Sequence, residues 1–182
     1  MKTPSPMATY STRLRLLPLI AATSLLLAGC FQSDQPKFPL ADAATPLGEG
    51  GRYAVYERGP DNRYQRQEVI VVKRRGDGAY DFVDDKGETQ TVSFHALGGD
   101  LFVGQAKAEK DQPGYGYAVV RMAGGEALVY VPQCDDQNKA ALTAAGVEVN
   151  AQLECILDRV GDAPALFKRL DLGEPVSKLV RE

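Results

Sequence analysis

Histidine is almost absent from this chain of 182 residues, which has one (His95) together with three cysteines and no tryptophan. Nucleophilic catalysis by serine or cysteine needs a base beside the nucleophile, and one histidine offers a single candidate of that type. A zinc site needs several histidine or cysteine ligands, which the chain lacks. His95 ends an expected strand, so we expect it to be a surface residue or a turn partner. The sequence thus predicts a protein with no catalytic residues, bound metal or cofactor.

Positive charge is also scarce. The chain has 21 Lys and Arg residues against 24 Asp and Glu, for a formal net charge of −3. Three of the bases, Lys2, Arg13 and Arg15, lie in the first 29 residues, which hold no acid. Removing these three leaves 18 bases against 24 acids, a charge of −6 for the remainder. A negative chain without a basic stripe repels nucleic acid, so we expect no nucleic-acid partner.

No apolar run is long enough to cross a bilayer, which takes roughly 20 residues. The longest run covers residues 16–27 and contains Pro18. A basic start, a short apolar run and then small residues is the layout of a secretory signal peptide. We therefore expect residues 1–29 to be a signal peptide rather than a transmembrane helix.

The end of this segment, Leu27, Ala28, Gly29 and Cys30, resembles the lipobox of bacterial lipoproteins. The resemblance implies cleavage between Gly29 and Cys30, with Cys30 acylated, for example by palmitate, as the first mature residue. Two or more acyl chains hold a protein stably on a membrane, whereas one holds it reversibly. Phe31 stands where an aspartate would favour inner-membrane retention in enterobacterial lipoproteins, which implies the outer membrane, facing the periplasm. The alternative is a secreted protein in which Cys30 is incidental.

Residues 30–50 are polar and spaced by Pro36, Pro39 and Pro46, without a sustained period. We interpret them as the lipidated cysteine followed by a flexible tether. The alternative is an ordered arm that packs Phe38 and Leu40 on the domain. Residues 51–182 are expected to form a single β-rich globular domain, since their apolar content supports one core.

Short alternating segments recur about every ten residues from position 52 to position 131, separated by Gly and Asp turns. This pattern predicts a mainly β fold, an antiparallel meander or a partly closed small barrel. About two C-terminal helices should follow, over 135–145 and 162–170, with Asp162 as the cap of the second and Gly146 ending the first. Residues 153–157 are expected to be a strand, and the tail from 173 is ambiguous.

With Cys30 lipidated, Cys134 and Cys155 remain as an even pair in an oxidising compartment, which predicts a structural disulfide. A reactive thiol at Cys134, just before an expected helix, is the alternative. The adjacent Asp135 and Asp136 oppose it by disfavouring a thiolate.

Two further features have a functional and a structural interpretation. The acidic pairs Asp84–Asp85 and Asp135–Asp136 are able to serve acid–base chemistry or Ca²⁺ binding, or simply turns and helix capping, which we favour. Tyr115 and Tyr117 alternate with Gly114 and Gly116. They are candidates to face a ligand, although a bend in a barrel explains the same pattern and is favoured.

These observations predict a membrane-anchored cell-envelope lipoprotein with a small binding or interaction domain and no enzymatic activity. Its partners would be the membrane, through the lipid anchor, and an envelope protein or small ligand. Two alternatives stay open. One is an envelope enzyme whose carboxylates converge only in the fold, and the other is a purely structural envelope component.

Overall fold

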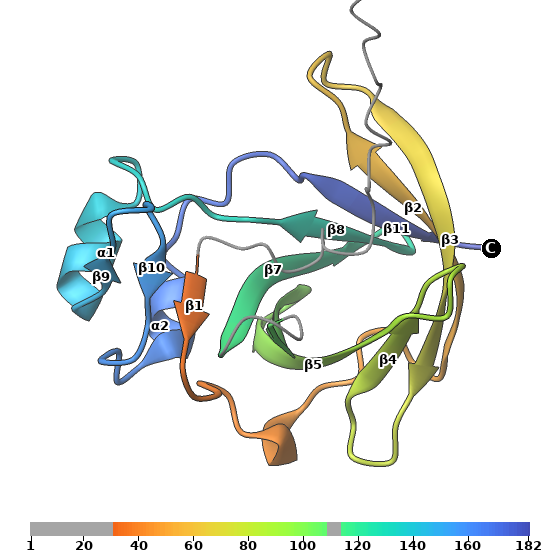
Figure 1. Ribbon diagram of the computed structural model, residues 1–182, viewed down its shortest axis with the longest axis horizontal. Coiled ribbons are helices and arrows are strands. Elements are labelled where there is room, and N and C mark those ends of the chain that lie inside the picture. Colours follow the sequence, from red (N-terminus) through yellow and green to blue (C-terminus); the bar gives the residue numbers. More distant parts are fainter. Residues whose placement is uncertain (1–30, 109–113) are drawn as a thin grey trace, which may run out of the picture.

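Eight antiparallel strands close into a barrel in the computed structural model, which describes residues 31–108 and 114–182 (Figure 1). The barrel strands are β2 (Gly50–Arg58), β3 (Tyr64–Arg74), β4 (Tyr80–Val83), β5 (Thr89–Gly98), β6 (Leu101–Lys107), β7 (Tyr115–Ala123), β8 (Glu126–Tyr130) and β11 (Ser177–Arg181). Strands β2 to β8 pair in sequence order, which confirms the expected meander. Closure leaves no free edge in this ring, the device by which barrels avoid edge-to-edge aggregation.

The ambiguous C-terminal tail supplies the closing strand. Strand β11 pairs with β2 on one side and β8 on the other, so that Leu179 lies opposite both Val55 and Ala127. The side chain of Leu179 points into the barrel and is 2% exposed. The last residues of the chain are therefore part of the barrel, not an appendage to it.

Alternation along the strands fills the barrel with apolar side chains. Its interior is formed by Tyr53, Val55, Ile70, Val72, Tyr80, Phe82, Val92, Phe94, Ala106, Ala118, Val120, Ala127, Val129 and Leu179, with Leu47 from the preceding segment. Small residues lie opposite large ones in this interior. At Gly104, for example, an added Cβ would lie 3.4 Å from the ring of Phe94, so the glycine leaves room for that ring. An eight-stranded barrel is just wide enough for side chains to fill in this way.

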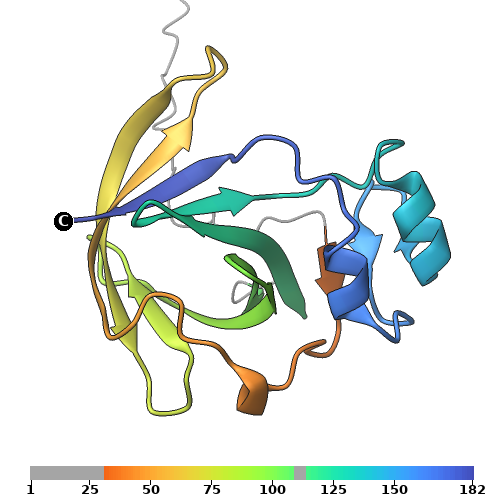
Figure 2. The ribbon, with the colours of Figure 1, turned by 180° about the vertical axis from the view of Figure 1, so that it is seen from behind.

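A second core covers the outside of β6 and β7. It is built by β1 (Phe31–Ser33), α1 (Lys139–Ala145), β9 (Glu148–Val149), β10 (Cys155–Ile156) and α2 (Ala163–Phe167), which lie together beside the barrel (Figures 1 and 2). Four aromatic rings meet at its centre, with Phe31 5.3 Å and Tyr117 5.9 Å from Phe167 between ring centroids, and Phe38 6.0 Å from the same ring.

The segment expected to be a flexible tether is instead an ordered arm from residue 31 to residue 50. Phe31 pairs with β7 and β10, Phe38 is 4% exposed, and Leu47 enters the barrel interior. Leu40, on the short 3₁₀ helix η2 (Leu40–Asp42), is 43% exposed and packs little. The arm is ordered because its widely spaced apolar residues bury themselves in both cores, which outweighs the polar, proline-rich composition.

Both C-terminal helices are present and shorter than expected. Asp162 caps α2 as predicted, accepting a hydrogen bond from Ala165 N at 2.9 Å, and Gly146 ends α1 at φ 71°. Helix α1 begins only at Lys139, because the side chain of Asn138 bonds Gln133 O and Asp171 N outside the helix. No helix in the described ranges is long and apolar enough to span a membrane.

Candidate functional site

The predicted disulfide is formed, and both of its cysteines belong to the second core, outside the barrel. Cys134, in the segment after β8, is bonded to Cys155 in β10, with the two Cα atoms 5.8 Å apart. Cys155 is fully buried and lies opposite Phe31 in the β1–β10 pair. The bridge therefore fixes the β9–β10 hairpin to the barrel at the point where the N-terminal arm begins.

Asp135 and Asp136, beside this bridge, serve local structure. Asp135 accepts hydrogen bonds from the backbone N–H groups of Gln137 at 3.1 Å and Asn138 at 3.4 Å, and Asp136 pairs with Lys139 at 3.6 Å. These contacts are those of a turn leading into a helix, in agreement with the favoured structural interpretation.

The two tyrosines of the glycine-rich run belong to the packed core. Tyr117 is fully buried, its hydroxyl lies 2.6 Å from Ser33 Oγ, and it accepts a hydrogen bond from Lys37 N at 3.1 Å. Burial raises the pKa of Tyr117 above its ordinary value of 10. Tyr115 is half-buried and packs on the edge of the same core. The less favoured interpretation, in which Tyr117 faces a ligand, does not fit this position, because the N-terminal arm covers the side chain.

Gly114, the first glycine of this run, has a packing cause. A Cβ at Gly114 would lie 2.5 Å from the backbone oxygen of Ser33, and Gly114 has a φ of 100°. The arm and β7 thus approach too closely for a larger residue.

His95 is buried, which contradicts the surface position expected from the sequence. It is 4% exposed, its ring stacks on Phe38 with centroids 5.0 Å apart, and its Nε2 lies 3.0 Å from Ser93 Oγ. Burial lowers the pKa of His95 below 6.5, partly offset by Asp42. The histidine lies on the outer face of β5, as the alternation requires, but the arm covers that face.

Ser93 and His95 could serve chemically as a nucleophile and its base, but a substrate cannot reach them. Both are more than nine-tenths buried beneath Phe38. A substrate carbonyl would have to displace the arm to reach Ser93 Oγ. The pair is therefore best interpreted as a polar contact inside a packed region, in which His95 Nε2 contacts Ser93 and the buried Nδ1 has no hydrogen-bond partner among the described residues.

Three carboxylates converge at one rim of the barrel. Glu68 on β3 approaches Asp84 and Asp85 in the β4–β5 turn, with oxygen atoms of all three within 4.8 Å of one another. Burial, followed by the charges of Asp84 and Asp85, raises the pKa of Glu68 above 4.5. Sequence reasoning missed Glu68, because the pairing of β3 with β4 brings it to a turn 16 positions away.

Asp84 in this cluster also stabilises the turn that the sequence predicted. Its Oδ1 accepts hydrogen bonds from Lys86 N at 2.9 Å and Glu88 N at 2.7 Å. Calcium takes six to eight oxygen ligands. Three carboxylates, one of them already engaged with the backbone, form a partial ligand set for a hard cation and a candidate acid–base pair.

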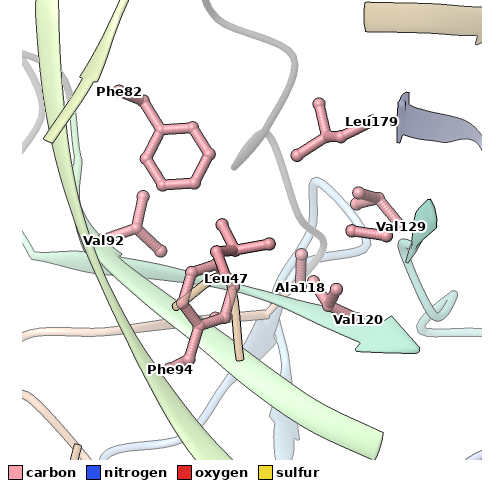
Figure 3. A pocket seen from close by; sticks show the side chains of 10 residues that line it. Leu47, Phe82, Val92, Phe94, Ala118, Val120, Val129 and Leu179 are labelled. Carbon is pink, nitrogen blue, oxygen red and sulfur yellow. The ribbon is translucent and has the colours of Figure 1, made fainter. Parts of the chain in front are cut away.

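Two hollows lie elsewhere in the structure. The barrel interior leaves a cavity of about 20 Å³ between the ten apolar residues that line it, among them Leu47, Phe82 and Leu179 (Figure 3). That is room for about one water-sized sphere, and an apolar cavity of this kind stays dry. A surface groove of about 250 Å³ lies between α1 and α2, and its lining includes Ala141, Ala144, Ala145 and Ala165.

Comparison with known proteins gives no family. No protein-family model matches the chain, and no curated protein or solved structure matches it significantly. The functional argument therefore depends on the residues of this chain alone.

The predicted cleavage and lipidation site, Gly29 and Cys30, lies outside the described residues. Lipidation stays a prediction from the lipobox. The structure describes the very next residue, Phe31, as a fully buried part of β1.

Proposed function

We propose that this protein is a bacterial cell-envelope lipoprotein, anchored through acyl chains on Cys30, whose barrel is a binding or interaction module without enzymatic activity. The observation that carries the export part is the Cys134–Cys155 disulfide, because such bonds persist in oxidising compartments such as the periplasm. It agrees with the signal-peptide layout and the lipobox, which are independent of it. The outer membrane, facing the periplasm, is the proposed location, since Phe31 rather than aspartate follows Cys30.

The binding interpretation is supported by how the chain uses its reactive groups. Ser93 and His95 are buried beneath the arm, and the barrel interior is occupied by apolar side chains. A partner, either another envelope protein or a small ligand, would therefore bind to the outer surface of the domain.

Native mass spectrometry of the protein, extracted from its own membrane in mild detergent, tests this function. We expect an acylated chain that retains a protein or small-molecule companion. A Cys30→Ser variant, expressed in the same host, should lose the acyl mass and leave the membrane fraction. An acylated chain that never carries a companion, under conditions where known envelope complexes survive, would contradict the binding role.

An envelope enzyme is the second candidate, favoured by one observation. Glu68, Asp84 and Asp85 converge at the barrel rim, and a carboxyl with a raised pKa beside other carboxylates is typical of acid–base sites. Incubation with purified cell-wall glycan tests it. Release of soluble fragments by the wild-type protein and not by Glu68→Gln would replace the binding proposal with a hydrolytic one.

A further inference from the structure

No linker separates the proposed anchor, Cys30, from the folded domain. One peptide bond separates Cys30 from Phe31, so their Cα atoms are about 3.8 Å apart. Phe31 is fully buried in β1, between β7 and β10. The next two residues are also fixed, by hydrogen bonds from Gln32 Nε2 to Glu154 Oε1 at 2.9 Å and between Ser33 Oγ and the Tyr117 hydroxyl. Acyl chains on Cys30 would therefore place a bilayer directly against this part of the domain.

The β9–β10 hairpin lies beside that point, on the opposite side of β1 from β7. Strand β1 runs parallel to β10, with Phe31 opposite Cys155. The N-terminal end of β1 therefore lies beside the end of β10 that Leu153 and Glu154 precede. Strands β1, β10 and β9 lie side by side, and η2 follows the C-terminal end of β1 (Figures 1 and 2).

Exposed apolar side chains gather on this hairpin. Three large apolar residues of the described chain are exposed, and two of them, Val149 at 46% and Leu153 at 68%, belong to this hairpin. Leu40 is the third, at 43%, and lies on η2. Because Leu153 is 68% exposed, most of its side chain contributes no hydrophobic stabilisation to the isolated domain.

The backbone holds Leu153 in this position against its own preference. Leu153 has a φ of 62°, a region that glycine and asparagine tolerate far better than leucine. The turn is rigid, because Asn150 Oδ1 accepts hydrogen bonds from Gln152 N at 3.0 Å and Glu154 N at 2.9 Å. Strain that the surroundings enforce at an exposed apolar residue is a reason to look for a function there.

The charges around the hairpin are neutralised or hydrogen-bonded. Glu148 forms an ion pair with Arg159. Glu154 accepts hydrogen bonds from Gln32 Nε2 at 2.9 Å and Asn150 Nδ2 at 2.6 Å. No acidic residue occupies the turn between Asn150 and Glu154 itself. The hairpin tip therefore presents apolar and amide groups.

We propose that Leu153, supported by Val149, inserts into the lipid surface beside the acyl chains, so that the barrel is held on the membrane in one orientation. This inference rests on the proposed lipidation of Cys30. The acyl chains supply the anchoring free energy, and the hairpin supplies a second, fixed contact. Two contacts define an orientation that a single flexible anchor does not.

A tryptophan placed at the hairpin tests the proposal, because the chain contains none. The full-length Leu153→Trp variant is produced in a host that acylates lipoproteins, and the mature protein is reconstituted in phosphatidylcholine vesicles with brominated acyl chains. We expect its fluorescence to shift to the blue and to be quenched by bromine. The matched control, Leu40→Trp, should keep the emission of a water-exposed tryptophan and stay unquenched.

Unquenched fluorescence from Leu153→Trp, in protein shown by mass to be acylated and by flotation to be vesicle-bound, would overturn the proposal. A blue shift that appears without lipid and grows with protein concentration would also overturn it, in favour of contact between two copies. A missing acyl mass on Cys30 would instead refute the proposed anchoring, which separates the two failures.

Hydrogen exchange gives a second measurement that does not depend on the tryptophan variants folding. Amide hydrogen exchange is compared between acylated protein on vesicles and the unacylated Cys30→Ser protein in solution. Slower exchange of residues 149–154 in the vesicle-bound protein supports the proposal. Equal exchange in this hairpin under both conditions would overturn it.

Discussion

Phe31 links the proposed anchoring position to the folded domain, so truncation of its side chain is the most direct perturbation of this arrangement. Its side chain is fully buried and contacts the ring of Phe167 on α2, 5.3 Å away. Truncating a buried phenylalanine to alanine costs about 3–5 kcal/mol, from lost burial and the cavity that remains. Because β1 is short, part of this cost will appear as local detachment of the arm rather than global unfolding. We expect Phe31→Ala to lower the free energy of unfolding by about 2–4 kcal/mol.

Urea denaturation followed by circular dichroism measures this loss, with Leu40→Ala as the control. Leu40 lies on the same arm but is 43% exposed, so its truncation should change stability by no more than about 0.5 kcal/mol. Limited proteolysis should cut the arm of Phe31→Ala well before that of the control. A loss for Phe31→Ala no greater than that for Leu40→Ala would refute the ordered arm and restore a flexible tether.

Three other predictions concern the disulfide and the shifted pKa values of Glu68 and His95. Reduction of Cys134–Cys155, whose loop spans 21 positions, should lower the free energy of unfolding by about 3 kcal/mol; equal urea midpoints with and without reductant would argue against this. Burial, then two nearby carboxylates, raises the pKa of Glu68, so its contribution to stability is complete below pH 4.5 and is lost as the pH rises through the raised value. Glu68→Gln should therefore raise the melting temperature more at about pH 7 than at about pH 4, and a pH-independent difference would count against the cluster. Burial lowers the pKa of His95, so the contribution of neutral His95 to the free energy of unfolding is present above pH 6.5 and is lost as the pH falls. The urea midpoint of His95→Phe should therefore vary less between about pH 7 and pH 5 than that of the wild type. An equal change in both proteins would indicate that the histidine is exposed.

The strands of the barrel could be predicted because each carries its own alternation. Val92 and Phe94 on β5, for example, face the interior while His95 faces out. What alternation does not reveal is whether a second layer covers the outer face. The arm does so here, and this is why His95 is buried although its strand was predicted correctly.

The arm and the closing strand were missed for related reasons. Phe31, Phe38 and Leu47 are spread over 17 positions among prolines and polar residues, so they form no period that a window would detect. Strand β11 has only five residues, and its pairing with both β2 and β8 is a property of closure rather than of local sequence. The acidic rim depends on the same kind of contact, since Glu68 reaches Asp84 only through strand pairing.

The central claim is that this barrel is attached to a bacterial membrane through Cys30, immediately before its first strand. Tandem mass spectrometry of the N-terminal peptide, from protein extracted out of its native membrane, tests it most directly. We predict a mature chain that begins at Cys30 and carries a diacylglyceryl group on its sulfur. A chain that retains residues 1–29, or one that begins at an unmodified residue, would contradict the claim.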